Sequence, residues 1–438
     1  MKTERTFVTP ARNAEPPEWL RLDNAATIYP PTMSRTLAPM FRFSVSLKEK
    51  VDPETLEKAL ETTLRRIPSF GYRLRNGLFW CYFQRLDGIP PVTEEVNNPL
   101  LRIDPKENRG FMFRVRYFED RVSLEVFHAL SDGTGGLTFL LTLITEYLRR
   151  KHGIVPQYGG RILDPDDPPT KEEREDAFYR FYRKVGALEH ERAAYQVPGD
   201  FEPRHILHIV TGKMKVDDVR SAAKRYGCTV TAYLASVLID AIQTVREKTG
   251  KGKRYKREIK VSIPVNLRSF YPTKTLRNFS SYVNIGIEPK YGHYSFDEIV
   301  AAVKAGMGTL ITEKRLNGKF TANVRLQKNP FIRAVPMFIK KHILSLSDRL
   351  MGDRYISTTF SNIGAVELPE EIAEYVDGMN FVLGRSRGKP GQAACISCDG
   401  TLYVTFSRQI KDSSTEMYFF RRLIEDGVPV EIESNRRT

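Results

Sequence analysis

"FHALSDGTGG", residues 127–136, is the stretch that decides the fold. His128 stands four positions before Asp132, and Gly133 follows the aspartate directly. The residues before His128 alternate apolar and polar side chains, which predicts a strand, and the apolar run after Gly133 predicts a helix. We therefore expect a strand-to-helix turn that carries a histidine and an aspartate.

His128 is open to three interpretations from its immediate surroundings. A histidine and an aspartate four residues apart can share a metal ion on a helix, but the predicted helix starts only after Gly133, and no third histidine has ligand spacing, so we expect no metal. A structural histidine, hydrogen-bonded at the end of a strand, stays open. So does a general base, because an imidazole with an ordinary pKa of about 6.5 accepts a proton at neutral pH.

Composition limits the class of protein. The chain has 438 residues, of which 41% are hydrophobic, enough for two domains or one large two-lobed unit. Four scattered cysteines form no disulfide framework, and neither a signal peptide nor an apolar run of spanning length is visible, so we expect a soluble, cytoplasmic protein. The net charge of +15 predicts an anionic partner: a nucleotide-bearing cofactor, an acidic carrier protein, a phospholipid surface or nucleic acid.

Strand and helix patterns alternate irregularly along the chain, which predicts an α/β fold with mixed sheets. The Pro-rich stretch 156–170 is the best linker, so we expect an N-terminal lobe over 1–170 and a C-terminal lobe over 171–438. A polar helix is expected to begin at Thr170. Other expected helices are one capped by Asp52, two that break at Gly227–Cys228, one from Phe296 to Leu310, and a long apolar-basic helix near 330–351.

Later motifs complete a pattern that begins with His128. "IPVNLRSF" places Arg268 just after a predicted strand, "RNFSSYVN" follows ten residues later, and "FSNIG" lies near the C-terminus. In this order the motifs resemble those of the HxxxDG acyltransferase superfamily: condensation domains of nonribosomal peptide synthetases, chloramphenicol acetyltransferase, alcohol acetyltransferases and polyketide-associated acyltransferases. The resemblance extends over most of the chain.

This resemblance implies a fold and a mechanism. The fold would be two chloramphenicol-acetyltransferase-like lobes with an active-site tunnel between them. His128 would take the proton from an acceptor that attacks a thioester, Asp132 would pair with Arg268 to hold the turn, and Gly133 would let the backbone fold sharply. Condensation domains usually carry a second histidine where this chain has Phe127, which favours a stand-alone O-acyltransferase over an N-acyltransferase.

Further residues are candidates for binding the substrates. Possible oxyanion or acceptor contacts are Tyr282, Asn284, Ser361 and Asn362. The basic stretch 246–260 is either a solvated loop or a landing site for coenzyme A phosphates or an acidic carrier, with Lys251, Lys253 and Arg254 as its candidate contacts. Nucleic acid is not expected, because the stretch has no interleaved aromatic residue apart from Tyr255 and no known binding motif.

Three functions follow, in order of preference. The first is an acyl-CoA-dependent acyltransferase acting on an alcohol, with no permanently bound cofactor. The second is a condensation or release enzyme whose donor is an acyl-phosphopantetheine on a carrier protein. The third is a non-catalytic binder of the same fold. "PFIRAVPMFIKKHILSL" (330–346) could also rest on a membrane surface, although core packing is the favoured interpretation.

Overall fold

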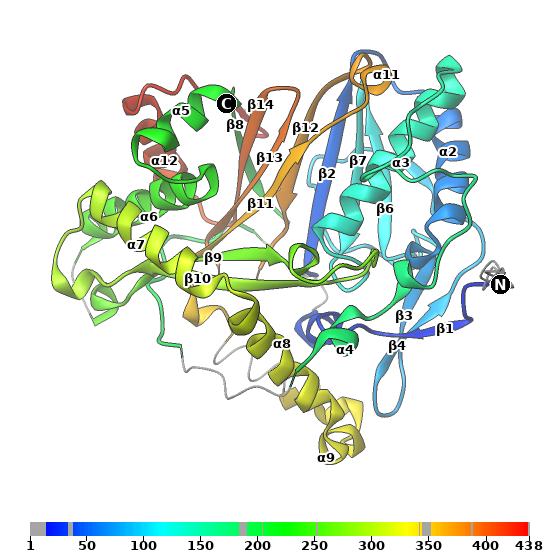
Figure 1. The fold of residues 1–438 in the computed structure, drawn as a ribbon, viewed down its shortest axis with the longest axis horizontal. Coiled ribbons are helices and arrows are strands. Elements are labelled where there is room, and N and C mark those ends of the chain that lie inside the picture. Colours follow the sequence, from blue (N-terminus) through cyan, green and yellow to red (C-terminus); the bar gives the residue numbers. More distant parts are fainter. Residues whose placement is uncertain are drawn as a thin grey trace, which may run out of the picture.

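The computed structural model describes residues 15–33, 38–183, 191–203, 205–250, 253–340, 342–343, 352–386 and 389–436. The chain forms two α/β lobes that lie side by side, each built on a mixed sheet (Figure 1). The predicted fold class, two lobes with mixed sheets, is confirmed.

The first lobe is a five-stranded sheet with helices α2 (Pro53–Arg66) and α3 (Gly133–His152) on one face. In spatial order its strands are β12 (Val376–Leu383), β2 (Met40–Leu47), β7 (Arg121–Phe127), β6 (Phe113–Phe118) and β5 (Val92–Glu94). Only β5 and β6 run parallel. Asp52 caps α2 as predicted, since its carboxylate accepts a hydrogen bond from the amide of Thr55.

A small antiparallel sheet lies beside this lobe. It consists of β1 (Trp19–Arg21), β4 (Cys81–Arg85) and β3 (Tyr72–Asn76). β3 and β4 form a hairpin whose tip, residues 77–80, projects from the molecule (Figure 1). The short helix α1 (Tyr29–Thr32) follows β1 in the chain.

The second lobe is a seven-stranded sheet. Its strands in spatial order are β10 (Ser280–Ile287), β9 (Ile259–Asn266), β11 (Thr358–Val366), β13 (Gly391–Cys398), β14 (Thr401–Arg408), β8 (His208–Lys215) and β15 (Glu431–Ser434). Its helices are α5 (Val216–Arg225), α6 (Val230–Thr249), α7 (Phe296–Leu310) and α12 (Ser414–Glu425). The predicted break between α5 and α6 and the predicted bounds of α7 are confirmed.

One strand of the second half belongs to the sheet of the first lobe. β12 pairs with β2 in an antiparallel register that runs from Val376 opposite Leu47 to Leu383 opposite Phe41. The chain therefore returns to the first lobe at β12. The predicted lobe boundary at residue 170 stays a prediction, and it concerns only the first passage of the chain from one lobe to the other. The polar helix predicted from Thr170 is only a 3-10 turn, Glu172–Arg174, followed after two residues by α4 (Ala177–Phe181).

The long helix predicted near 330–351 is wrong in the part that the structure describes. α8 (Glu313–Lys328) precedes it, and α9 (Pro330–Ala334) ends after five residues. Val335 has an extended backbone, as the residue before a proline prefers, and a new helical turn starts after Pro336. Residues 341 and 344–351 lie outside the described residues. The apolar side chains of this segment are largely exposed, so its favoured use in the core is also wrong.

No single helix within the described ranges is long and apolar enough to cross a membrane. α5 and α6 pass that test only as a pair, and the pair is bent by 77° at its break.

Candidate active site

The HxxxDG turn joins β7 to α3. His128 follows the last residue of β7, and its amide donates to the carbonyl of Pro39 at 2.9 Å. Asp132 has an extended backbone and caps α3, because its Oδ1 accepts from the amide of Gly135 at 3.1 Å. The sequence folds this way because an aspartate before a helix satisfies an amide that has no partner within the helix.

Asp132 and Arg268 are in contact across 136 residues of sequence. The distance from Arg268 Nη1 to Asp132 Oδ2 is 2.8 Å, and both side chains are largely buried. The same carboxylate oxygen accepts from the amide of Phe279 at 2.8 Å. Arg268 also donates to the carbonyl oxygens of Thr275 and Arg277, at 2.9 and 2.6 Å from Nη2. The pair therefore ties residues 275–279 to the HxxxDG turn.

Glycine at position 135 allows this close approach. A Cβ atom there would collide with the carbonyl oxygen of Leu276 and the hydroxyl of Ser131. Ser131 donates to that same carbonyl at 2.6 Å. Gly133 has a similar role toward β11, because a Cβ atom would lie 2.9 Å from the side chain of Ile363. Small residues in the turn thus let Leu276 and β11 of the second lobe approach it closely.

The imidazole of His128 is half-buried between aromatic rings. Tyr29 stacks on it, with ring centroids 4.7 Å apart, and Phe41 meets it edge-on at 5.2 Å. Burial lowers the pKa of His128 below its ordinary value. The charges of Asp132 and Asp23 oppose this shift only in part. The imidazole is consequently neutral at physiological pH, the form that can accept a proton.

Asn278 defines which ring nitrogen of His128 is available. Its Oδ1 lies 3.1 Å from Nδ1 of His128. Its Nδ2 faces two oxygens, Asp23 Oδ2 at 3.2 Å and the carbonyl of Ala129 at 3.4 Å. Because the amide nitrogen must donate to those oxygens, Oδ1 is the atom that faces the imidazole, so Nδ1–H donates to it and Nε2 keeps its lone pair.

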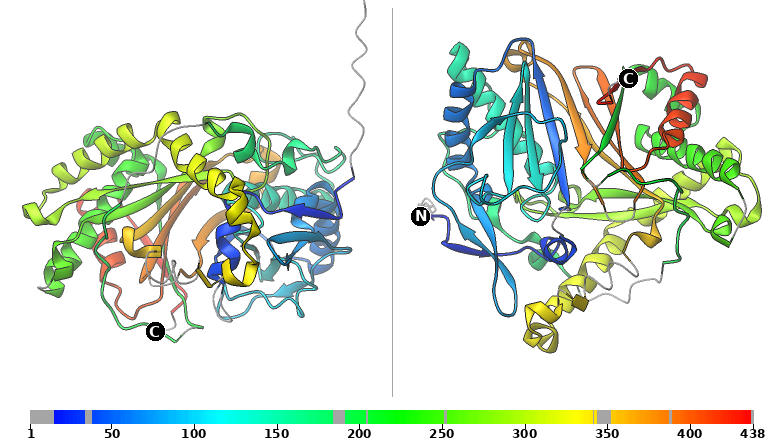
Figure 2. Two further views of the ribbon diagram at one scale, coloured as in Figure 1. Left: turned by 90° about the horizontal axis from the view of Figure 1, so that it is seen from below. Right: turned by 180° about the vertical axis from the view of Figure 1, so that it is seen from behind.

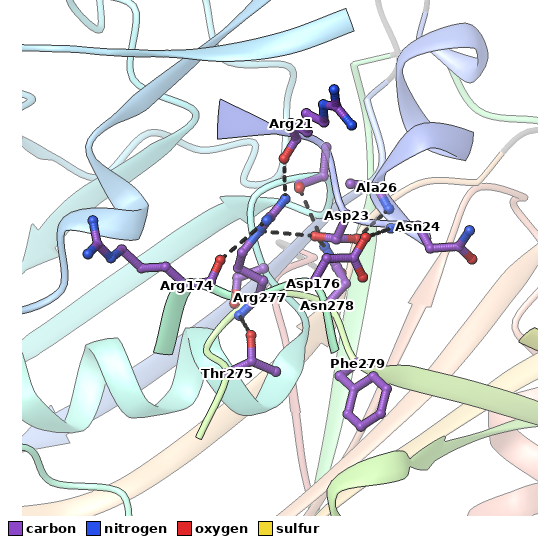
Figure 3. A network of polar contacts seen from close by, with 12 residues as sticks. Arg21, Asp23, Asn24, Ala26, Arg174, Asp176, Thr275, Arg277, Asn278 and Phe279 are labelled. Atoms are coloured by element: carbon purple, nitrogen blue, oxygen red, sulfur yellow. Dashed lines mark hydrogen bonds and ion pairs between the residues drawn. The ribbon is translucent and has the colours of Figure 1, made fainter. Parts of the chain in front are cut away.

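Behind Asn278, a buried network joins three separate segments (Figure 3). Asp23 Oδ1 accepts from the amide of Ala26 at 2.7 Å, and Arg277 Nε lies 3.6 Å from Asp23 Oδ2. Arg277 also donates to the carbonyl of Arg21 at 2.6 Å. Asp176 accepts from the amide of Asn24 at 3.0 Å. The network fixes the N-terminal segment against residues 174–178 and 275–279.

The pKa values of the two carboxylates in this network, Asp23 and Asp176, are both raised. Burial raises the pKa of Asp176 to about 7, and the nearby charge of Asp23 adds to the shift. Burial also raises the pKa of Asp23, which the guanidinium of Arg277 counteracts. We did not expect Asp23, Tyr29, Asp176 or Arg277 near His128 from the sequence. Asn278 stands inside the quoted "RNFSSYVN", but the motif alone gave it no role.

The other candidate residues lie farther from this centre. Hydrogen bonds and ring contacts of the described residues link none of Tyr282, Asn284, Ser361 and Asn362 to His128. Tyr282 is exposed beneath Lys319, and Asn284 donates to Glu191. Asn362 donates to Thr231 at 2.9 Å and accepts from the amide of Gly364 at 2.8 Å. Ser361 and Asn362 directly precede Ile363, whose side chain a Cβ atom on Gly133 would meet, so β11 passes close to the HxxxDG turn.

The basic stretch has partners inside the protein where it is described. Arg246 donates to the carbonyl of Tyr255 at 2.7 Å, and Lys260 donates to that of Arg192 at 2.7 Å. Lys251 lies outside the described residues, and Lys253 and Arg254 belong to a 3-10 turn, Lys253–Lys256. Their role with the donor stays a prediction. Among the described residues, no group of three or more His, Cys, Asp and Glu side chains is arranged to hold a metal.

Comparisons of sequence give two likenesses. A family model described as alcohol acetyltransferase matches residues 184–297, which include β9, β10, Arg268 and Asn278. An uncharacterised protein of Mycobacterium tuberculosis (strain H37Rv) is 24% identical over 368 residues, covering 76% of this chain and 80% of that protein.

Comparisons of structure extend over nearly the whole chain. Polyketide synthase associated protein 5 from M. tuberculosis has a TM-score of 0.58 at 14% identity, covering 92% of this chain and 96% of that one. TRI101 of Fusarium sporotrichioides, in complex with coenzyme A and T-2, has a TM-score of 0.58 at 11% identity, covering 95% and 100%. The first condensation domain of the calcium-dependent antibiotic synthetase has a TM-score of 0.60 at 14% identity, covering 94% and 99%. At these identities the likeness shows a shared fold.

Proposed function

The chain has the two-lobed fold of the chloramphenicol acetyltransferase-like acyltransferases, as its motifs predicted, and from this premise we propose that it transfers an acyl group from a thioester to an alcohol. The match of residues 184–297 to the alcohol acetyltransferase family supports the alcohol as acceptor. The similar fold of a protein solved with coenzyme A supports acyl-CoA as donor.

One observation carries the mechanism: the hydrogen bond between His128 Nδ1 and Asn278 Oδ1. It leaves Nε2 with a free lone pair, which takes the proton from the acceptor hydroxyl as the oxygen attacks the thioester carbonyl. A carbon–oxygen bond forms and a tetrahedral oxyanion results. When this intermediate collapses, the carbon–sulfur bond breaks, and the proton on Nε2 passes to the departing thiolate. No net proton is consumed.

Asp132, Gly133 and Arg268 act through the shape of the turn and touch neither substrate. Both carboxylate oxygens of Asp132 accept hydrogen bonds from protein groups, which supports a structural role for this residue. A donor for the oxyanion is still needed. We place it among Ser361, Asn362 and Tyr282, with β11 favoured because a Cβ atom on Gly133 would lie 2.9 Å from the side chain of Ile363.

Release of thiol tests the proposal directly. Acetyl-CoA and longer acyl-CoAs are offered together with pooled alcohols and pooled amines, and free coenzyme A is measured. We expect thiol release that depends on the alcohol pool. Release only with acyl groups on a carrier protein would instead support the carrier-dependent reaction, in keeping with the shared fold of a condensation domain. No release from either donor would support a non-catalytic binder.

A pH profile tests the role of Asn278. Because burial lowers the pKa of His128, the acid limb of kcat/KM is expected below pH about 6.5, the ordinary imidazole value. Asn278→Ala should lower kcat about five- to tenfold, the scale of one lost hydrogen bond. It should also move the limb further down, since Asn278 favours the protonated ring.

Asn380→Ala is the matched control for that experiment. Asn380 lies on β12, donates to Thr211 at 3.0 Å and accepts from Thr405 at 2.6 Å, far along the sheet from β7's end. Its loss should lower stability without moving the acid limb. An acid limb at or above pH about 6.5 in the wild-type protein would contradict the lowered pKa of His128. An acid limb that Asn278→Ala leaves in place would contradict the role given to Asn278.

A further inference from the structure

The segment from α8 onward has an unusual distribution of charge. Residues 314–347 contain eight Lys or Arg and no Asp or Glu. In the described part of this segment, Arg325, Lys328 and Arg333 are exposed. A run of positive charge without any acidic residue is attracted to negative surfaces and repelled by positive ones.

Large apolar side chains stand exposed among these charges. They come from α9, from the helical turn after Pro336 and from the tip of the β3–β4 hairpin. Their exposed fractions are Phe331 83%, Phe338 62%, Ile343 59%, Leu78 67% and Trp80 55%. We call these five residues the apolar platform. Exposed apolar side chains gathered in one place mark a surface that binds something apolar.

The platform is held in place by hydrogen bonds between its two parts. The amide of Met337, a buried residue, donates to the carbonyl of Leu78 at 2.6 Å. Lys340 Nζ donates to the carbonyl of Phe79 at 2.8 Å and to that of Arg333 at 3.2 Å. These contacts join the hairpin tip to the helical segment, although more than 250 residues separate them in sequence. The platform is therefore a defined surface.

The platform projects from the body of the protein. Figure 1 shows α9 and the hairpin tip together below both lobes, and the view from behind in Figure 2 shows the same arrangement. A projecting apolar tip can enter a fluid layer, whereas binding to a rigid protein would require a complementary groove. Trp and Phe side chains flanked by Arg and Lys are the combination found at lipid headgroups.

We propose that the apolar platform binds the surface of an anionic lipid bilayer. Phe331, Phe338 and Trp80 enter the boundary between headgroups and acyl chains, and Arg333 lies at the level of the lipid phosphates. The opposite charge of those phosphates matches a segment that has no acidic residue. This inference is independent of the acyl-transfer proposal, since it concerns a different surface.

Vesicle co-sedimentation tests the inference with the full chain. Vesicles of phosphatidylcholine alone are compared with vesicles that also contain phosphatidylglycerol. We expect binding to the anionic vesicles, which salt weakens. Phe331→Ser and Phe338→Ser should each lower the affinity about tenfold or more, because each removes a side chain that is buried on binding. Arg333→Glu should lower it by at least about fivefold for the lost charge alone.

Tyr291→Ser is the matched control, because Tyr291 is also aromatic and 74% exposed but lies in the second lobe after β10. It should bind vesicles like the wild type. Circular dichroism melting of every variant checks the fold. Absence of binding to anionic vesicles at low salt overturns the inference, and so does an equal loss in Tyr291→Ser. Vesicle binding unchanged by both phenylalanine substitutions, with weakened acyl transfer from a carrier protein, would assign the platform to a protein partner.

Discussion

Replacement of His128 by alanine is expected to lower kcat by about 10²–10⁴-fold, the range that loss of a general base typically produces. The reason is that, among the described residues, none of the other side chains that form ring contacts or hydrogen bonds with the imidazole can accept the proton. Tyr29 has a pKa raised far above its ordinary value by burial, and Phe41 has no ionisable group. KM for both substrates should change little, because the ring is not proposed to bind them. Steady-state thiol release measures both constants.

His152→Ala is a closely matched control. His152 also stacks on a tyrosine, with its ring centroid 4.4 Å from that of Tyr375, and it bonds Glu49. It lies at the far end of α3 from the HxxxDG turn. We expect kcat to be retained in His152→Ala. If His128→Ala kept wild-type kcat while releasing thiol in an acceptor-dependent way, the base would be another group and the proposed mechanism would be wrong.

Arg268→Ala should have the largest effect on stability. It leaves the buried carboxylate of Asp132 without its cation and two carbonyl oxygens without a donor. Breaking one partner of a buried ion pair costs about 3–5 kcal/mol of folding free energy. Denaturant titration measures this loss. Activity should fall as well, because the 275–279 segment carries Asn278 against His128.

Arg66→Ala separates these two effects. Arg66 and Glu173 form another buried pair, with two hydrogen bonds of 3.0 and 2.9 Å, and the pair does not contact His128. The Arg66→Ala variant should lose folding free energy on a similar scale, but the folded protein should keep its kcat. Asp132→Asn should resemble Arg268→Ala in activity. If Arg268→Ala changed neither the folding free energy nor kcat, the ion pair between Arg268 and Asp132 would have no role in the site.

Local signals in the sequence were sufficient to predict where many helices and strands begin and end. Asp52 followed by proline marks the start of α2, and the glycine between α5 and α6 marks their break. The HxxxDG turn was also readable, since a strand pattern, an aspartate cap and glycines follow one another within a few residues. Such features depend on hydrogen bonds between close neighbours, so spacing alone reports them.

Residues that meet only in the folded chain could not be predicted in this way. Asp23, His128 and Asn278 are joined by hydrogen bonds over separations of 150 and 255 residues. The sequence around each of these residues gives no indication that it lies close to the other two. The prediction for the segment after α8 failed for two other reasons. Pro336 interrupts the helix, because the residue before a proline prefers an extended backbone. The alternation of apolar and basic residues also fits a buried helix as well as an exposed one.

Strand β12 limits where this protein can be cut. A fragment that ends at residue 170 would lack β12, so the outer edge of β2 would present unpaired backbone groups to other molecules. Exposed strand edges of this kind template aggregation. A chimera that exchanges the first lobe for that of a relative must therefore carry residues 376–383 from the same parent, or redesign their seam with β2. The two lobes share this strand exchange, so a segment that can be swapped between relatives does not coincide with a lobe as seen in the fold.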